Sequence, residues 1–258
     1  MLLKNKRALI IGLMSNRSIA YGIAESFHQH GALQGFSCME RFLGRVDQLS
    51  AEWSPLMVKS CDVSKDEDLD QLATFVKQHM GHIDVLVHSI AFAPRDHLEG
   101  QVYAQTSREG FQQSLDISVY SLIGLVNKLL PFMRPSASVI ALSYIGSQQA
   151  IPSYNVMGIA KAALESSVRY LARDCGEHGI RVNAISAGPI RTASAAGVKG
   201  MGDMLNQLSQ TTPLKGCIST KQVGQVATFL ASDLSSCITG EVIFADNGYH
   251  MMGGACLQ

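Results

Sequence analysis

Short apolar runs alternate with longer segments of helical period along the whole chain. The runs rich in Val, Ile and Leu predict strands, and the segments whose apolar residues recur every three to four positions predict helices. The predicted strands span residues 7–11, 33–38, 56–59, 84–89, 139–143, 181–185 and 241–245. The predicted helices span residues 19–30, 65–79, 108–130, 155–175 and 220–232.

This order of elements is typical of βαβ units in a parallel sheet. With right-handed crossovers it predicts an α/β fold, a single-domain Rossmann-like doubly wound parallel sheet of seven strands with helices on both faces. Such sheets bind ligands beyond the carboxyl ends of their strands. There is no repeat and no second apolar cluster behind a linker, so residues 1–258 are predicted to form one domain. The segment 193–210 is rich in small residues and glycine and is predicted to be a flexible substrate-binding lid.

Composition narrows the possible functions. The chain has 258 residues, of which 47% are hydrophobic and 16% charged, in keeping with one compact domain. Lys plus Arg and Asp plus Glu both total 21, so no excess of positive charge is available for nucleic-acid binding. No uninterrupted apolar run approaches the roughly 20 residues that a membrane-spanning helix needs. We therefore expect neither a nucleic-acid partner nor a membrane partner.

The cysteines and histidines carry no metal-site pattern. The six cysteines are scattered without a Cys-x-x-Cys pair, and the eight histidines show no ligand spacing. The sequence thus predicts no metal site, reduced thiols and a cytoplasmic protein.

The first strand runs into a turn with features of a phosphate-binding site. Gly12 allows a sharp turn beside a pyrophosphate, Ser18 can cap the exposed amides ahead of Ile19, and Gly22 is expected to let the helix approach the sheet closely. An ordinary strand-to-helix turn also favours Gly and Ser. The turn alone therefore predicts a dinucleotide site without excluding a structural role.

The ends of the second and third strands are candidate adenosine contacts. After the second strand, Met39 is followed by Glu40, which suits an unphosphorylated ribose, and by Arg41, which suits the extra phosphate of NADPH. Both signals occur together, so the choice between NADH and NADPH stays open. Asp62 could accept a hydrogen bond from the adenine amino group while Val63 packs on the ring, or Asp62 could simply cap the following helix.

The fourth and sixth strands end in candidate nicotinamide contacts. Ser89, Ile90 and Ala91 are small or apolar residues where a cofactor could lie against the backbone. Main-chain groups of Ile190 could pair with the carboxamide, and Thr192 could meet the pyrophosphate. The alternatives are a purely structural strand end and a rigid Gly-Pro turn.

Tyr144, Tyr154 and Lys161 form the most informative pattern. Tyr154 and Lys161 are about two helical turns apart and so share one face, and helical side chains lean back toward the N-terminus. A phenol beside a fixed ammonium is expected to become a better hydrogen-bond or proton donor. Alternatively, the tyrosine packs at a helix start and the lysine lies in solvent.

At this helix the sequence resembles a known family. The spacing Tyr-x6-Lys, with a second tyrosine ten residues earlier, resembles the divergent branch of the short-chain dehydrogenase/reductases, the NADH-type bacterial enoyl-acyl-carrier-protein reductases. The matching segments are SIAYGIA, HSIAFAP, REGF, LSYIG, IPSYNVMGIAKAALE, RVNAISAGPIRT and SSCITGEV. Two positions depart from the family: Met39 replaces a frequent Gln, and Asn247 replaces the first Gly of Asp-Gly-Gly. Because Asn tolerates left-handed backbone, little consequence is expected from the second change.

The resemblance implies a reaction and its residues. Hydride would pass from NADH, with NADPH not excluded, to the β-carbon of a trans-2-enoyl thioester in type II fatty acid synthesis. Tyr154 would stabilise the enolate oxygen, Lys161 would hold the nicotinamide ribose, and Tyr144 would line the acyl pocket. The substrate residues so implied are Ala93, Tyr144, Tyr154, Met157, Ala195 and Ala196. For Met157 a role in the core is an equal alternative.

The resemblance also implies partners. These are an acyl-carrier protein that delivers the substrate and a homotetramer built through the helices at 108–130 and 155–175. Two other functions are alternatives. A main-branch alcohol or ketone oxidoreductase would carry Tyr-x3-Lys, which is absent, and a catalytically silent dinucleotide sensor should have lost Tyr154 or Lys161.

Overall fold

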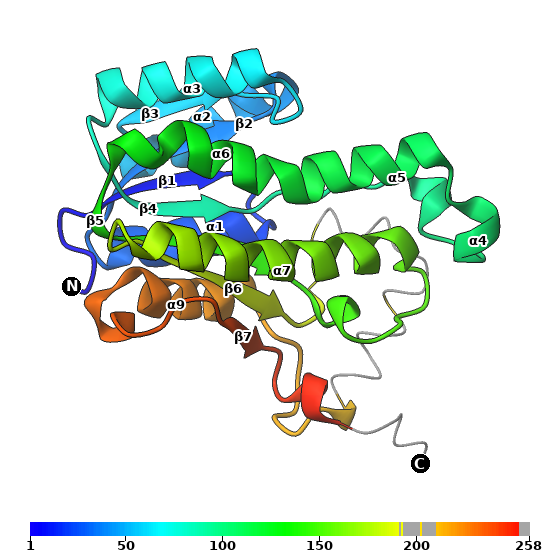
Figure 1. Cartoon of the computed structure of the whole chain (residues 1–258). Coiled ribbons are helices and arrows are strands. Elements are labelled where there is room, and N and C mark those ends of the chain that lie inside the picture. Colours follow the sequence, from blue (N-terminus) through cyan, green and yellow to red (C-terminus); the bar gives the residue numbers. More distant parts are fainter. Residues whose placement is uncertain (191, 193–201, 203–209, 253–258) are drawn as a thin grey trace.

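A wholly parallel seven-stranded sheet forms the centre of the molecule (Figure 1). The structure is a computed structural model that describes residues 1–190, 192, 202 and 210–252. In it the strands lie in the order β3-β2-β1-β4-β5-β6-β7. Their bounds are β1 Arg7–Ile11, β2 Leu33–Cys38, β3 Met57–Ser60, β4 Ile83–His88, β5 Met133–Ser143, β6 Arg181–Ala187 and β7 Val242–Ala245. This arrangement confirms the predicted doubly wound fold.

Helices cover both faces of the sheet. Their bounds are α1 Ile19–Gln29, α2 Leu43–Ser50, α3 Asp66–His79, α4 Val102–Gln105, α5 Arg108–Leu115, α6 Ser121–Leu129, α7 Asn155–Gly176 and α9 Thr220–Ala231. Buried side chains of α3, α6 and α7 form one core against the sheet, and those of α1, α2 and α9 form the other (Figure 1). The central strands β1 and β4 are therefore covered on both sides, in keeping with their mostly apolar sequences.

Three helical regions differ from the sequence prediction, and one of them is the short helix α4, which was not predicted. The predicted helix at 108–130 is divided by a π-helical stretch, Asp116–Tyr120, between α5 and α6. Helix α2 was missed, because it is short, contains Gly44 and buries only Val46 and Ser50. The other predicted helix ends agree with the structure to within one residue.

Strand β5 begins six residues before the predicted start at residue 139. Its first part contains Arg134, Pro135 and Ser136, which are partly or fully exposed, and Ser136 has a positive φ of 71°. The pairing with β4 shifts register at this place, after Ile83 pairs with Met133. An irregular, polar strand start lacks the apolar run that marks a buried strand, so the pattern did not reveal it.

Gly22 allows a close helix–helix contact, which corrects the expectation that it brings a helix close to the sheet. A Cβ on Gly22 would lie 2.3 Å from the carbonyl oxygen of Thr220 at the start of α9, and a Cβ on Gly224 would lie 2.2 Å from the carbonyl oxygen of Gly22. Helices α1 and α9 therefore pack backbone against backbone through these two glycines.

Replacing Gly224 with alanine should destabilise the protein by about 1–3 kcal/mol, because the added methyl group must push α9 away from α1. Thermal and urea unfolding measure the change. The control is Gly44→Ala on exposed α2, where nothing lies within 4 Å of the new Cβ. That variant should be neutral or slightly more stable. Equal stabilities of the two variants would contradict the close packing.

The helical stretch Arg108–Phe132 is long and apolar enough to cross a membrane by length and composition alone. In this fold, however, Leu122, Leu125 and Leu129 are at most 1% exposed and belong to the core between α6, α3 and the sheet. The stretch therefore packs as a core helix.

Candidate active site

The predicted site residues follow the carboxyl ends of parallel strands and therefore gather at one edge of the sheet. The residues at or after strand ends are Gly12 on β1, Met39 on β2, Asp62 on β3, Ser89 on β4, Tyr144 on β5 and Ile190 on β6. Strands β1 and β4 are neighbours although they are not consecutive, so the topological switch point lies between them. Open α/β sheets bind their ligands beyond such a point.

The turn after β1 is fixed by close backbone packing. Gly12 has a φ of 99°, and a Cβ there would lie 2.2 Å from the carbonyl oxygen of Ser89. The amide of Ser89 donates to the carbonyl of Ile11 at 3.0 Å. The Ser18 hydroxyl accepts from the amide of Tyr21 at 3.3 Å and so caps α1. The tight turn and the cap are thus confirmed, while contacts of Gly12, Ser18 and Ile19 with a pyrophosphate stay predictions.

The candidate adenosine contacts differ from one another in exposure and in hydrogen bonding. The Met39 side chain is 42% exposed beyond β2, and the Arg41 guanidinium lies 3.7 Å from its sulfur and 4.9 Å from the ring centroid of Phe42. Asp62 Oδ1 accepts hydrogen bonds from the amide and hydroxyl of Ser64, so this carboxylate stabilises a turn before α3. Val63 is 7% exposed and belongs to the core. The N-cap of α3 is Lys65, so Asp62 does not cap this helix, and the adenosine contacts of Asp62 and Val63 stay predictions.

Beyond β4 and β6 the candidate nicotinamide contacts are partly accessible. Ser89 and Ile90 are half-buried and Ala91 is exposed. Ile190 is buried in the core, and its carbonyl accepts from the amide of Thr192 at 2.7 Å. The predicted lid at 193–210, with Ala195 and Ala196, falls almost entirely outside the described residues.

Tyr144 and Tyr154 form an edge-to-face pair. Their ring centroids are 4.8 Å apart and the ring planes meet at 72°. A Cβ on Gly146 would lie 2.5 Å from the Tyr154 ring, and a Cβ on Gly158 would lie 2.7 Å from the Gly146 carbonyl oxygen. The segment after β5 therefore packs directly against the start of α7, and this packing fixes the Tyr154 ring.

The Tyr144 hydroxyl is buried and has no hydrogen-bond partner among the described residues. Buried polar groups in native proteins are nearly always satisfied, so such a group points to a ligand. This orphaned hydroxyl next to Tyr154, together with the glycine turn after β1, fits a dinucleotide and substrate laid across the switch point.

Burial raises the pKa of Tyr154, and the neighbouring Tyr144 raises it further. The pKa of Tyr144 is raised by burial and then by Tyr249. This direction is opposite to the one that a nearby ammonium would give, since desolvation of the phenolate dominates. Both phenols are therefore protonated at neutral pH, and their role as hydrogen-bond donors stays a prediction.

Lys161 is 5% exposed, and its ammonium donates to the carbonyl of Leu142 at 2.6 Å. The alternative of a lysine in solvent is therefore excluded. Burial lowers the pKa of Lys161 to about 8, and the charge of Glu165 opposes this shift. A buried lysine on α7, the helix whose N-cap residue is Tyr154, is typical of a functional site.

Sequence reasoning missed Glu165. Its Oε1 accepts from the hydroxyl of Ser143 at 2.5 Å and from that of Ser147 at 2.6 Å, and the side chain is 5% exposed. A glutamate four positions after a candidate lysine, between the apolar Leu164 and Val168 of the same helical face, was the available signal.

Sequence reasoning also missed Ser118 in the π-helical stretch, a local structure often found at functional sites. Its hydroxyl accepts from the amide of Phe92 at 3.0 Å and donates to the carbonyl of Phe92 at 3.1 Å. It also lies 3.9 Å from the sulfur of Met157, which is 6% exposed in the core. Ala93, close to these residues, is half-buried.

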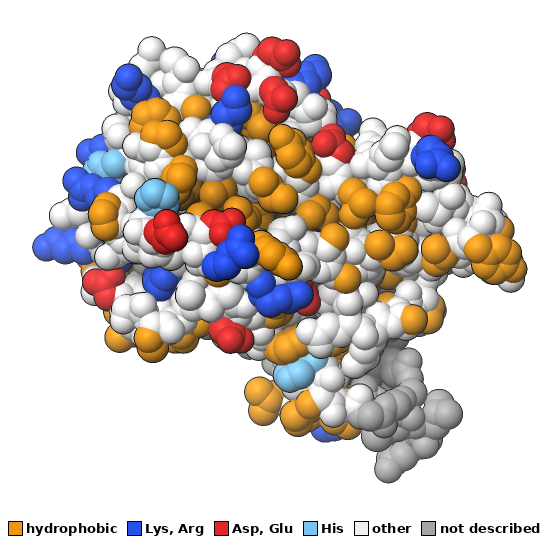
Figure 2. All heavy atoms as spheres, viewed as in Figure 1, with side chains coloured by type: hydrophobic (Ala, Val, Ile, Leu, Met, Phe, Trp, Pro, Cys, Tyr) orange, Lys and Arg blue, Asp and Glu red, His pale blue; other side chains and the backbone are white. Residues whose placement is uncertain are grey.

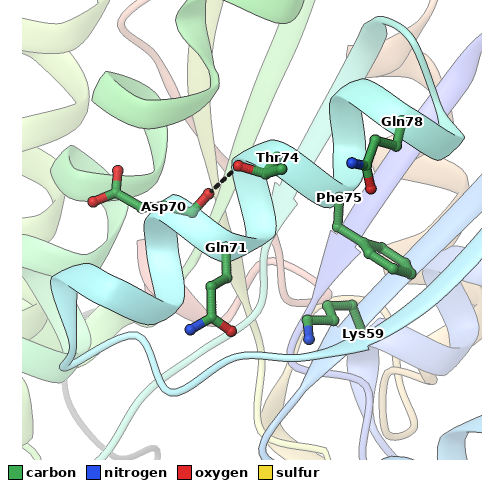
Figure 3. A pocket seen from close by; sticks show the side chains of 6 residues that line it. All are labelled: Lys59, Asp70, Gln71, Thr74, Phe75 and Gln78. Carbon is green, nitrogen blue, oxygen red and sulfur yellow. Dashed lines mark hydrogen bonds between the residues drawn. The ribbon is translucent and has the colours of Figure 1, made fainter.

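A cavity of about 310 Å³ lies away from this edge, between β3 and α3 (Figure 3). It is lined by Lys59, Asp70, Gln71, Thr74, Phe75 and Gln78. None of these residues belongs to the predicted site. The lining comes largely from the outer surface of α3, so the cavity is a surface depression separate from the candidate active site.

Comparison with known proteins agrees with this geometry. The family model described as "Enoyl-(Acyl carrier protein) reductase" matches residues 12–250. An enoyl-[acyl-carrier-protein] reductase [NADH] of Aquifex aeolicus is 48% identical over 254 residues, which are 98% of this chain and 94% of that protein. The crystal structure of the Aquifex enzyme has a TM-score of 0.95 to this chain and covers 98% of this chain and 100% of its own.

Two further structures carry dinucleotides. The Bacillus cereus enoyl-acyl carrier protein reductase with NADP+ and indole naphthyridinone is 42% identical, with a TM-score of 0.95 over 98% of this chain and 99% of that one. The Anaplasma phagocytophilum reductase in complex with NAD is 37% identical, with a TM-score of 0.94 over 100% of this chain and 96% of that one. From the family match, the near-complete coverage and the site at the switch point, this chain belongs to the enoyl-acyl-carrier-protein reductase family.

Proposed function

We propose that this chain is an enoyl-acyl-carrier-protein reductase that uses NADH to reduce trans-2-enoyl thioesters in type II fatty acid synthesis. The observation that carries the proposal is the buried Tyr154, paired with Tyr144 and followed on α7 by the buried Lys161. Bound NADH would supply a hydride to the β-carbon of the substrate. The relatives named above support both the reaction and the cofactor.

Tyr154 acts on the thioester oxygen in this proposal. Hydride addition at the β-carbon leaves negative charge on that oxygen, as an enolate, until the α-carbon is protonated. Because burial raises the pKa of Tyr154, its hydroxyl keeps its proton and donates a hydrogen bond to the growing charge. Tyr144, whose hydroxyl lacks a partner among the described residues, lines the acyl pocket beside it.

Lys161 holds the nicotinamide ribose in this proposal. Its ammonium is already oriented by the Leu142 carbonyl at 2.6 Å, which leaves further donors free to reach ribose hydroxyls. Because the side chain is buried, each of these hydrogen bonds is stronger than in water. Met157 lies at the position where a main-branch oxidoreductase would carry its tyrosine, and it is 6% exposed in the core. The main-branch alternative therefore lacks the tyrosine that would act as the acid.

The test is to follow the loss of nicotinamide absorbance with a crotonyl thioester, with NADH and NADPH in parallel. We expect reduction to the saturated thioester with NADH as the better donor, since the exposed Met39 offers no charge to a 2′-phosphate and Arg41 lies against Met39 and Phe42. Oxidation of secondary alcohols with NAD, without enoyl reduction, would overturn the proposal. A preference for NADPH would overturn the cofactor assignment alone.

We also infer an acyl-carrier protein as substrate carrier, a homotetramer and a cytoplasmic location. Side chains on α6, α7 and the π-helical stretch support the tetramer, because several are apolar and exposed: Tyr120, Ile123, Ile159 and Tyr170. Figure 2 shows hydrophobic side chains over the region of α6 and α7. Cys38, Cys61, Cys175 and Cys237 are free thiols, as in a reducing compartment.

A further inference from the structure

The buried carboxylate of Glu165 ties the segment 143–147 to α7. Ser143 ends β5 and Ser147 ends the 3-10 turn Ile145–Ser147, and the hydroxyls of both donate to the same oxygen, Oε1 of Glu165. Leu142, the residue before this segment, accepts the hydrogen bond from Lys161. Two side chains one helical turn apart on α7 therefore hold the end of β5.

The tied segment carries or contacts both tyrosines of the site. Tyr144 lies within it, between the two serines that donate to Glu165. Gly146 also lies within it and packs against the Tyr154 ring so closely that a Cβ would be 2.5 Å from that ring. Any movement of the segment would therefore displace Tyr144 directly and would change the packing around the Tyr154 ring.

The charge of Glu165 also acts on Lys161. Among the described residues, the titratable groups linked electrostatically to Lys161 are Glu165 on α7 and His88 at the end of β4. Tyr144 and Tyr154 belong to the same candidate site. Burial, with help from the Lys161 charge, lowers the pKa of His88 to about 3, so this imidazole is neutral. The phenols are neutral as well, because burial raises their pKa values. Glu165 thus supplies the negative charge that favours the buried ammonium.

We propose that Glu165 is a positioning residue of the reductase: it holds the segment 143–147 so that Tyr144 and Tyr154 face the substrate, and it keeps Lys161 protonated to bind the NADH ribose. The inference rests on the proposed function for the roles of Tyr154 and Lys161. A buried carboxylate is costly unless it is hydrogen-bonded, and here the hydroxyls of Ser143 and Ser147 supply the hydrogen bonds.

Glu165→Gln tests the charge, because the amide oxygen can still accept from both serines. The readout is the dissociation constant of NADH, measured by calorimetry from pH 6 to pH 10. In the wild type, affinity should fall as pH rises through the pKa of Lys161. In Glu165→Gln the midpoint should move down by at least about one pH unit.

The matched control, Glu177→Gln at the exposed end of α7, should keep the wild-type midpoint. An unshifted midpoint in Glu165→Gln overturns the proposal.

Lys161→Met separates this inference from the proposed function, since it should remove the pH midpoint altogether. If the midpoint persists in that variant, the ribose role of Lys161 fails and the proposed function must change, whatever Glu165 does.

Ser147→Ala tests the hold on the segment, because it removes one donor and keeps the charge. We expect kcat with a crotonyl thioester to fall about tenfold with the midpoint unchanged; a wild-type kcat overturns the positioning role. Thermal melting checks that each variant folds. If Glu165→Gln does not fold, Glu165→Asp replaces it: the retained charge should leave the midpoint in place and the shorter side chain should lower kcat. A wild-type kcat in that variant would also overturn the proposal.

Discussion

Replacing Tyr154 with phenylalanine should lower kcat about 100-fold while leaving the affinity for NADH nearly unchanged. The hydroxyl is expected to stabilise an oxygen that gains negative charge only as hydride is transferred, and loss of one such donor costs roughly 3 kcal/mol of transition-state stabilisation. The phenylalanine ring should keep the edge-to-face contact with Tyr144 and the packing against Gly146, so the fold should be preserved.

Steady-state kinetics with a crotonyl thioester and a separate NADH titration measure the two effects. Tyr103→Phe, a change of the same kind at a side chain of α4 that is 85% exposed, is the matched control and should be neutral. Tyr144→Phe should lower kcat much less, because that hydroxyl is expected to line the acyl pocket. A wild-type kcat for Tyr154→Phe would remove this residue from the mechanism, and a large loss in Tyr144→Phe alone would reassign the donor.

Replacing Lys161 with methionine should weaken NADH binding about 10- to 100-fold, with a loss of turnover at saturating thioester. A hydrogen bond from a charged group contributes about 1.5–3 kcal/mol, and methionine keeps most of the side-chain volume while removing every donor. The variant also leaves the carbonyl of Leu142 and the carboxylate of Glu165 without the ammonium, so a lower melting temperature is expected. Lys161→Ala should bind NADH as weakly but lose more stability, because it adds a cavity.

Calorimetric titration with NADH checks this result, and thermal melting separates binding from folding. Lys221→Met, at an exposed position of α9, is the matched control and should bind NADH as the wild type does. Wild-type affinity in folded Lys161→Met would contradict the ribose role. The pH profile makes the same prediction independently: as burial lowers the pKa of Lys161 to about 8, wild-type affinity should decline above that pH.

The strands show how much of the fold the apolar sequence pattern can predict. Strands β1 and β2 have their predicted limits, because each is a buried run bounded by polar or turn residues. The irregular start of β5 and the short helix α2 were not predicted, because neither has a regular apolar period. Gly22 was expected to face the sheet, yet its partner is Gly224 on α9, about two hundred residues later in the chain. Hydrophobic periodicity can indicate that a helix packs closely against another element, but it does not identify that element.

In the candidate active site, too, the sequence predicted some features and only the fold decided others. Spacing placed Tyr154 and Lys161 on one helix, and the helix formed as predicted. Spacing also suggested that the ammonium would make the tyrosine more acidic, whereas in the fold the ammonium donates to Leu142 and burial raises the pKa of Tyr154. Desolvation depends on everything that packs around a group, so no local pattern could have predicted its outcome.

The sequence by itself determined the alternation of strands and helices, the doubly wound sheet and the residues that follow each strand end, because hydrophobic period and turn chemistry are local properties. Only the tertiary structure decided that Glu165 holds Ser143 and Ser147 beside Lys161, that Gly146 seats Tyr154, and that the Tyr144 hydroxyl is buried without a partner among the described residues. These facts depend on which side chains share a buried space, and such proximity arises when the sheet and α7 pack together.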